Sequence, residues 1–233
     1  MKPRFDICLS LFLLFCLGSE SHANTVARMP VCEWYPKADV VFVGTATKIS
    51  EVTRTTAHIN FSVKERFKGV STADVELVCS GMVLIGVGVS FNVGEDYLVD
   101  AYRDEEGVLK TGPCDLAAPS NAVAADVIFL RSLNGKNRPK TVVYGTIRQF
   151  GRSGPDSQPE LRALAGTPIR LSGPTGTVEA VSRLDGYFEF PDVVSGEYTV
   201  TPLLPKTLKQ DSQKVTVGSS GCADASFIAI EKQ

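Results

Sequence analysis

Cysteine and histidine are the residues whose chemistry is easiest to recognise in this chain, and their spacing argues against a metal or redox centre. Beyond residue 23 the sequence holds one histidine, His58, and four cysteines: Cys32, Cys79, Cys114 and Cys222. Zinc-binding and redox motifs require cysteines within a few residues of each other, and no two of these four are that close. A catalytic zinc ion typically needs three protein ligands, and one histidine does not supply them. The four thiols are therefore candidates for disulfides, with three possible pairings.

Other charged residues offer no better case for catalysis. His58 lies in an alternating stretch, opposite the apolar residues Ile59 and Phe61, which favours a solvent-facing side chain over a catalytic base. Residues 104–106 are acidic, as are Asp185 and Asp192, but calcium needs six to eight oxygen ligands and carboxylates at a turn rarely converge. Nucleophile-elbow, Walker and dinucleotide-binding motifs do not occur. The sequence predicts no catalytic residue, no metal site and no cofactor.

The first 23 residues have the pattern of an export signal. Lys2 and Arg4 precede an apolar run at residues 7–17, and small residues lead to a cleavage site after Ala23. The run is too short to cross a bilayer, which needs about 20 residues. We expect a mature chain that begins near Asn24, in the periplasm or outside the cell, where cysteines can pair.

A lipid anchor at Cys16 is the rival interpretation of the same segment. The residue before an acylated cysteine is normally small, and Phe15 is not. A single lipid chain also anchors a protein weakly. Cleavage after Ala23 is therefore preferred.

Composition and charge narrow the remaining function classes. The chain has 233 residues and a formal net charge of −2, and residues 1–23 carry as many basic as acidic side chains. A charge this close to zero gives no electrostatic case for binding nucleic acid or an anionic membrane. The mature sequence has no apolar run long enough for a transmembrane segment. Its length suits one large or two modest domains, and its pattern favours two.

Apolar alternation predicts a first β unit, over residues 24–133. The expected strands are residues 38–49, 57–63, 74–79, 97–102 and 108–111, with a bulged, glycine-interrupted segment at residues 83–91. One helix should follow, with Ser120 as its N-cap and its end near residues 134–135. The polar residues 134–140 are predicted to form an interdomain linker.

Residues 141–233 have a purely β pattern. Turn residues separate seven short strands, a spacing typical of a β-sandwich. The expected strands are residues 142–150, 167–171, 177–183, 187–190, 197–203, 214–217 and 223–230.

Five blocks of the first unit match a known module: Cys32 and residues 38–44, 67–69, 94–99 and 109–114. With them the unit resembles the netrin-like module, which is shared with tissue inhibitors of metalloproteinases. The resemblance implies an OB-type, five-stranded barrel with one packed helix. In the inhibitors an N-terminal Cys-x-Cys chelates the zinc of the protease, and here Asn24 begins the mature chain while Cys32 matches the family's third cysteine. Protease inhibition is therefore disfavoured.

The second unit has three matching blocks, at residues 164–171, 185–190 and 193–200. Through them it resembles the carboxypeptidase regulatory-like domain, a transthyretin-type sandwich. Asp185 and Gly186 would form a tight hairpin turn. The resemblance implies a seven-stranded sandwich and says little about activity.

The first resemblance also implies a disulfide. In the resembling inhibitors, the counterparts of Cys79 and Cys114 both bond to the N-terminal Cys-x-Cys, so they lie near one point of the barrel. Because that motif is absent here, we expect a Cys79–Cys114 bridge. Cys32 and Cys222 are left over, as free thiols or as a bridge between the units. We favour free thiols, because the linker does not hold the units in bridging geometry.

Trp34 and Tyr35 are the candidate interaction surface. They follow Cys32 at the edge where the inhibitor branch contacts its target, and Trp and Tyr are common interface anchors. The alternative is that Trp34 closes the end of the barrel as a core residue.

The favoured function is a secreted or envelope-associated, non-enzymatic protein that acts in protein interaction or scaffolding. Its partner is an unidentified extracellular or envelope protein, with polysaccharide as the alternative. A carbohydrate-binding sandwich is the second hypothesis, through its expected loops at residues 151–159 and 173–174, although these loops offer no aromatic platform except nearby Phe150. Protease inhibition is the third.

Overall fold

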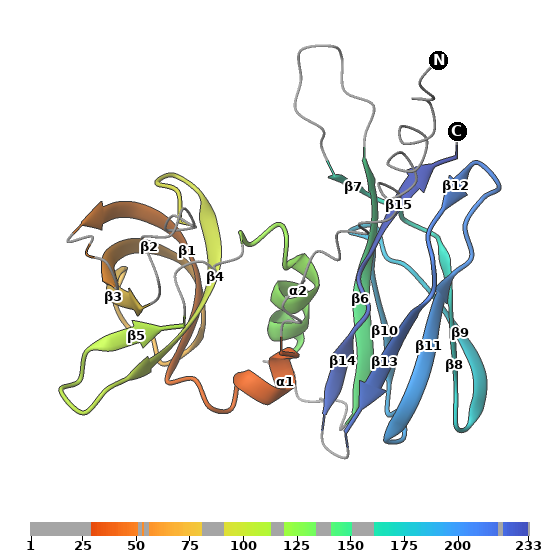
Figure 1. The fold of residues 1–233 in the computed structure, drawn as a ribbon, viewed down its shortest axis with the longest axis horizontal. Coiled ribbons are helices and arrows are strands. Elements are labelled where there is room, and N and C mark those ends of the chain that lie inside the picture. Colours follow the sequence, from red (N-terminus) through yellow and green to blue (C-terminus); the bar gives the residue numbers. More distant parts are fainter. Residues whose placement is uncertain are drawn as a thin grey trace, which may run out of the picture.

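The protein is described by a computed structural model that covers residues 29–50, 53, 56–80, 91–112, 119–133, 141–150, 161–218 and 221–232. Within these residues the chain is mainly β, as predicted. A closed barrel and a two-sheet sandwich stand side by side, and two helices lie between them (Figure 1).

The first unit is a closed barrel of five strands. They are β1 (Val40–Ser50), β2 (Thr56–Lys68), β3 (Asp74–Ser80), β4 (Asp96–Arg103) and β5 (Leu109–Thr111). The order around the barrel is β1-β2-β3-β5-β4, and β4 returns to β1. As the alternation predicted, Ile59 and Phe61 of β2 are buried in the barrel, while His58 lies on its outer, partly exposed face. Phe91 and Tyr97 pack edge to face against Phe61 and fill the centre.

The helices differ in part from the prediction. The expected helix is α2 (Ala124–Leu133), and a second, short helix, α1 (Val31–Trp34), was not predicted. Residues 120–123 form a turn ahead of α2, so Ser120 does not directly precede the helix as its N-cap. Its backbone N–H instead donates to the carbonyl of Asp96 at 2.7 Å, which ties the turn to the barrel. Residues 81–90, most of the predicted bulged segment, and the predicted linker lie outside the described residues.

The second unit is a sandwich of a six-stranded and a four-stranded sheet. The six-stranded sheet has the order β10-β6-β15-β12, with β7 and β14 also paired to β6, and the four-stranded sheet has the order β13-β11-β8-β9. The strands are β6 (Val142–Phe150), β7 (Leu161–Ala163), β8 (Pro168–Gly173), β9 (Gly176–Val181), β10 (Tyr187–Pro191), β11 (Gly196–Pro202), β12 (Leu208–Lys209), β13 (Gln213–Val217), β14 (Cys222–Asp224) and β15 (Phe227–Glu231).

All seven expected strands are present, and three details differ. The short strands β7 and β12 were not predicted, and the last expected strand is divided into β14 and β15. Asp185 and Gly186 form a turn, with the Asp185 carboxylate accepting the N–H of Tyr187 at 3.0 Å and Gly186 at a φ of 80°. The turn is not that of a hairpin, because β9 and β10 belong to different sheets and the chain crosses between them there.

Candidate functional site: the junction of the two units

The outer face of the six-stranded sheet is apolar where it faces the barrel. Val142 and Tyr144 of β6 point to this face, whereas Val143 and Ile147 point into the core of the sandwich. All four side chains are buried. A strand that is apolar on both faces needs a covering layer on each, and α2 supplies the second one.

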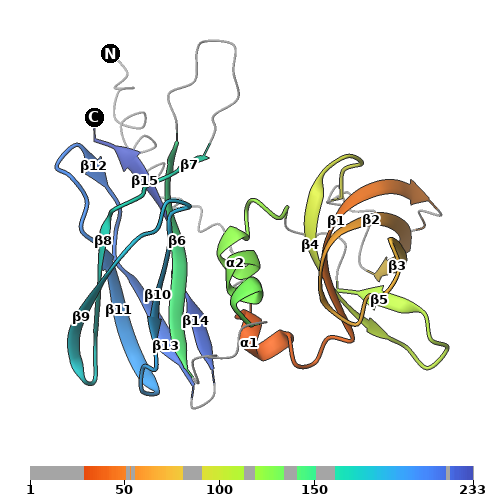
Figure 2. The same ribbon diagram turned by 180° about the vertical axis from the view of Figure 1, so that it is seen from behind.

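One apolar cluster runs from the barrel through α2 to the sandwich. Phe129 of α2 stacks on Tyr144 with ring centroids 4.4 Å apart and an interplanar angle of 7°. The buried members of the cluster come from both units and both helices: Val31, Trp34, Ala38, Val41, Val43, Leu98, Ala125, Val127, Phe129, Leu130, Val142, Tyr144, Tyr187 and Cys222. The helices therefore lie between the two units, as both ribbon views show (Figures 1 and 2).

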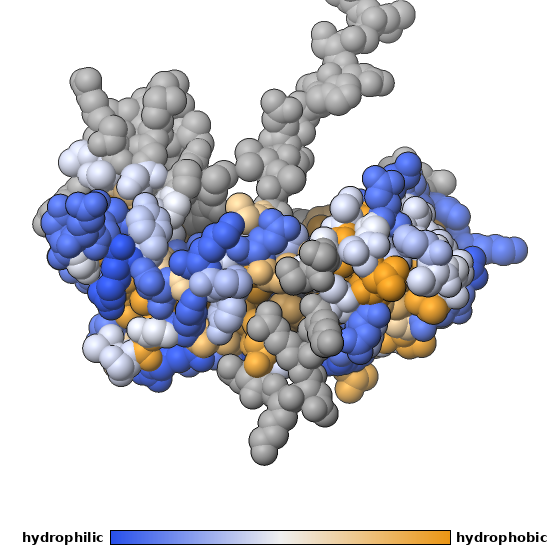
Figure 3. Space-filling view, turned by 90° about the horizontal axis from the view of Figure 1, so that it is seen from below, coloured by the Kyte–Doolittle hydropathy of each residue, from blue (hydrophilic) through white to orange (hydrophobic). Residues whose placement is uncertain are grey.

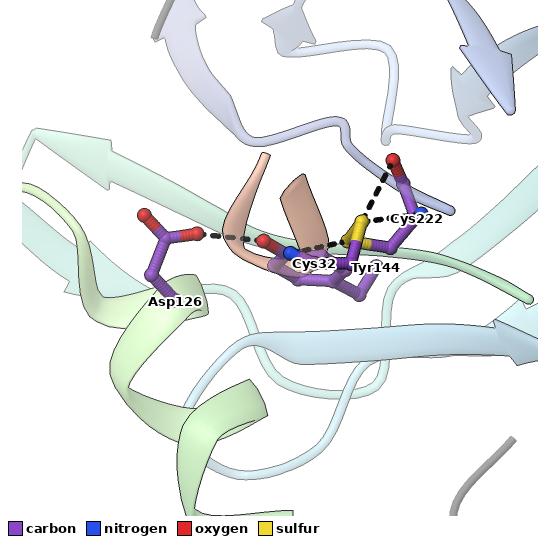
Figure 4. The surroundings of a disulfide bond; sticks show 4 residues. All are labelled: Cys32, Asp126, Tyr144 and Cys222. Atoms are coloured by element: carbon purple, nitrogen blue, oxygen red, sulfur yellow. Dashed lines mark hydrogen bonds between the residues drawn. A yellow bond between two sulfur atoms is a disulfide. The ribbon is translucent and has the colours of Figure 1, made fainter. Parts of the chain in front are cut away.

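A buried hydrogen bond lies within this cluster. The Tyr144 hydroxyl donates to the Asp126 carboxylate at 2.7 Å, so a sandwich strand and α2 share a polar contact inside an apolar layer (Figure 4). Burial raises the pKa of Tyr144 well above its usual value, and the neighbouring Asp126 and Asp224 carboxylates raise that pKa further. The phenol therefore stays protonated and remains a donor over the whole physiological range.

Cys32 and Cys222 form a disulfide across the junction, and the preference for free thiols was wrong. Their Cα atoms lie 5.7 Å apart although the residues are 190 positions apart in sequence. Cys32 is in α1 and Cys222 begins β14, and the backbone N–H of each residue donates to the sulfur of the other (Figure 4). β14 pairs in parallel with the start of β6, which brings Cys222 to the side of the sandwich that α1 contacts. Packing of the helices against the sandwich brings the two cysteines into bridging geometry.

The predicted Cys79–Cys114 bridge is only half within the described residues. Cys79 is fully buried in β3 and is disulfide-bonded. Cys114 lies outside the described residues, so the identity of the pair stays a prediction. Peptide mapping without reduction checks it, and a Cys79–Cys114 peptide is the expected result.

The candidate interaction residues Trp34 and Tyr35 lie at the junction. Trp34 is 9% exposed and belongs to the apolar cluster, where its indole N–H has no hydrogen-bond partner among the described residues. Tyr35 is half-buried, and its hydroxyl donates to the carbonyl of Phe67 at 3.2 Å. The burial of Trp34 supports the alternative in which it is a core residue, although this core belongs to the junction rather than to the end of the barrel.

A cleft of about 390 Å³ lies where the barrel, α2 and the β9–β10 turn meet. Four of its five charged residues form ion pairs: the Lys64 ammonium lies 2.7 Å from the Asp96 carboxylate, and Arg131 of α2 binds the Glu65 carboxylate through two nitrogens. The fifth, Asp185, accepts the backbone N–H of Tyr187. The hydrogen bond from Lys64 lowers the pKa of Asp96, and the hydrogen bond to Glu65 raises the pKa of Arg131. These pairs tie β2 to β4 and to α2.

The other residues considered for chemistry lie on the surface. His58 Nδ1 lies 2.9 Å from a Glu76 carboxylate oxygen, and this hydrogen bond lowers the pKa of Glu76. Asp104, in the acidic turn, pairs with Lys110 at 2.7 Å. Across the described ranges, no group of three or more His, Cys, Asp or Glu residues is placed to hold a metal ion. In the same residues no helix is both long and apolar enough to cross a membrane.

No family profile matches the chain, and no curated protein matches it in sequence. In structure it is similar to the minor pilin GBS52 of Streptococcus agalactiae, with 9% identity, a TM-score of 0.32 and 84% of each chain covered. The TIE protein of Bacillus anthracis gives 9% identity and a TM-score of 0.32, with 83% of this chain and 35% of that one covered. BcpA, the major pilin subunit of Bacillus cereus, gives 11% identity and a TM-score of 0.31, with 82% of this chain and 59% of that one covered. Likeness at this level assigns neither a family nor a function to the chain.

Proposed function

We propose that this protein is an extracytoplasmic, non-enzymatic scaffold whose two β units present their surfaces to protein partners in a fixed relative orientation. The Cys32–Cys222 disulfide carries the proposal, because it joins the first described helix to a late sandwich strand. The apolar cluster around α2 supports the same conclusion, since it buries side chains from both units together. Two disulfide-bonded cysteines of the junction and a third in the barrel suit an oxidising compartment.

The proposal also covers the identity of each unit, the boundary between them and the export signal. A netrin-like identity for the first unit is supported by its closed barrel with a helix packed beside it. A carboxypeptidase regulatory-like identity for the second is supported by its two-sheet sandwich. We place the domain boundary in residues 134–140, between α2 and β6. The export signal at residues 1–23, with cleavage after Ala23, completes the proposal.

A binding experiment tests this function by comparing the wild type with a variant that lacks the contacts holding the two units together. The mature protein is immobilised and exposed to the extracytoplasmic fraction of its source, beside a Cys32→Ser/Cys222→Ser/Phe129→Ala variant in which circular dichroism verifies that both units remain β-folded. We expect saturable capture of a defined protein by the wild type and weaker capture by the variant. Equal capture by both forms contradicts a role for fixed orientation. Binding to polysaccharide alone supports the carbohydrate-binding alternative, for which half-exposed Phe150, the last residue of β6, is the candidate aromatic contact.

A further inference from the structure

The edges of the sandwich are unequally protected against pairing with another strand. Six of its strands pair with a single neighbour among the described residues. Three of these, β7, β12 and β14, are only two or three residues long. β10 ends in Pro191, and β13 carries an exposed lysine, Lys214. Short length, proline and lysine are the usual means by which proteins prevent edge-to-edge association, and only β9 lacks all three.

β9 is a regular, six-residue edge. It pairs with β8 from residue 176 to residue 181 without a register shift, so no bulge twists the edge away. Val178 lies opposite Leu171, a core residue, and so points to the core side of the sheet, yet it is 55% exposed. Val181 on the other face is 60% exposed, and Leu184 in the following turn is 92% exposed. Both faces of this edge therefore offer uncovered apolar side chains.

The edge is also electrically neutral. Its one charged residue is Glu179, and Arg170 on the neighbouring strand binds the Glu179 carboxylate through Nε and an NH2 group at 3.0 and 2.9 Å. A strand of a charged partner would find no complementary charge here. A second copy of the same neutral strand meets no unbalanced charge.

We propose that β9 pairs antiparallel with β9 of a second copy of this chain, so that two four-stranded sheets become one continuous sheet. The favoured register places Val178 opposite its own equivalent, where each covers the exposed core-side surface of the other. It also places Glu179 opposite Thr177, an alcohol that can donate to the carboxylate. A register centred on Glu179 would oppose two carboxylates directly, which is unfavourable.

The position of β9 leaves room for this dimer. The β8–β9 hairpin lies on the side of the sandwich away from the barrel, so the two barrels would point outward from a sheet in the middle (Figures 1 and 2). A single pair of short strands falls below the roughly 1,200 Å² of buried surface at which stable interfaces begin. The association is therefore weak and depends on concentration. It rests on the β9 edge alone and does not depend on the function proposed for the junction.

Sedimentation velocity of the full mature protein over increasing concentration tests the proposal. We expect the wild type to shift from monomer toward dimer, and Val178→Lys to remain monomeric at every concentration, because two lysines would face each other at the symmetry axis. Thr216→Lys is the matched control, since Thr216 is exposed on β13, the opposite edge of the same sheet. It should associate like the wild type. Urea unfolding midpoints of both variants verify that they are folded.

Cysteine cross-linking tests the register. Residues directly opposite in an antiparallel pair have Cα atoms about 4.5 or 5.5 Å apart, within the range of about 4.4–6.8 Å that a disulfide spans. Under brief, mild oxidation we expect Val178→Cys to form a covalent dimer and Leu184→Cys, which lies outside β9, to form far less. A wild type that is monomeric throughout overturns the proposal. Association that Val178→Lys leaves intact, or equal cross-linking at both positions, overturns it as well.

Discussion

At the scale of single residues, the junction depends on polar groups held inside an apolar layer. Tyr144 is buried and donates to Asp126, and both residues face the space between the units. Nearby, Tyr187 is buried beside Glu189 and Asp185, and burial, with the adjacent carboxylates, raises its pKa far above the usual value. Each phenol is therefore uncharged in the folded state at a pH at which an unfolded tyrosine ionises.

Replacing Tyr144 with Phe removes the donor to Asp126 and leaves the ring stacking in place. We expect a loss of about 1–3 kcal/mol in the free energy of unfolding near neutral pH, the usual cost of a lost partner for a buried polar group. Urea unfolding measures it. Tyr102→Phe is the control, because Tyr102 is exposed on the barrel, and it should change the stability little.

The same tyrosines give an alkaline pH dependence. Their pKa values are raised in the folded state, whereas an unfolded tyrosine ionises near pH 10. The folded state then binds more protons above pH 10, so stability falls as the pH rises, by up to about 1.4 kcal/mol per pH unit for each tyrosine. Tyr144→Phe should make this fall less steep by one such contribution. An unchanged slope between the wild type and the variant would show that Tyr144 ionises normally.

Removing the Cys32–Cys222 disulfide should lower the stability of the protein. Cys32→Ser/Cys222→Ser removes a bond between residues 190 positions apart. We expect a loss of about 2–5 kcal/mol in the free energy of unfolding, because the open chain gains conformational freedom in its unfolded state. Chemical denaturation of the two forms without reductant measures the difference. Coincident unfolding curves would contradict a stabilising role for the bond.

At the scale of elements, α2 is the part of the chain that both units share. Phe129 packs on Tyr144 of the sandwich, while Arg131 on the exposed side of the helix binds Glu65 of the barrel. The apolar face should therefore matter far more to stability than the charged one, because an exposed ion pair contributes at most about 1 kcal/mol.

Two substitutions in α2 separate these contributions. Phe129→Ala empties a fully buried site and should cost about 3–5 kcal/mol. Arg131→Ala breaks the exposed pair with Glu65 and should cost about 1 kcal/mol or less. Thermal or urea unfolding compares them. Equal losses would contradict the expectation that the apolar face of α2 stabilises the protein more than its charged face.

Alternation predicted most of the elements, since local sequence decides them. β6 has the predicted bounds, residues 142–150, and Ile59 and Phe61 are buried as expected. The run Val142-Val143-Tyr144 is apolar on successive residues, and this is the signal that could have revealed a strand covered on both faces. α1 was missed because four residues give no periodicity. The Cys32–Cys222 bridge was missed because it follows from the docking of α1 beside β14, a contact between distant parts of the chain that no local pattern encodes.

At the scale of the whole molecule, the structure joins the two units by three kinds of contact. The disulfide is covalent, the cluster around α2 is apolar, and the hydrogen bond from Tyr144 to Asp126 is polar. An interface between domains in one chain permits relative motion by default unless it is large and hydrophobic. Here the apolar layer and the bond act together, so we expect the barrel and the sandwich to move as one body.

Backbone ¹⁵N relaxation of the oxidised mature protein at low concentration tests this central claim most directly. Amide groups in the strands of the barrel and of the sandwich each report the overall tumbling of their own unit. We predict one common tumbling time, and one shared diffusion tensor, for β1–β5, α2 and β6–β15. Two distinct and shorter tumbling times, one for the barrel and one for the sandwich, would contradict the account, because they would show that the units reorient independently despite the disulfide.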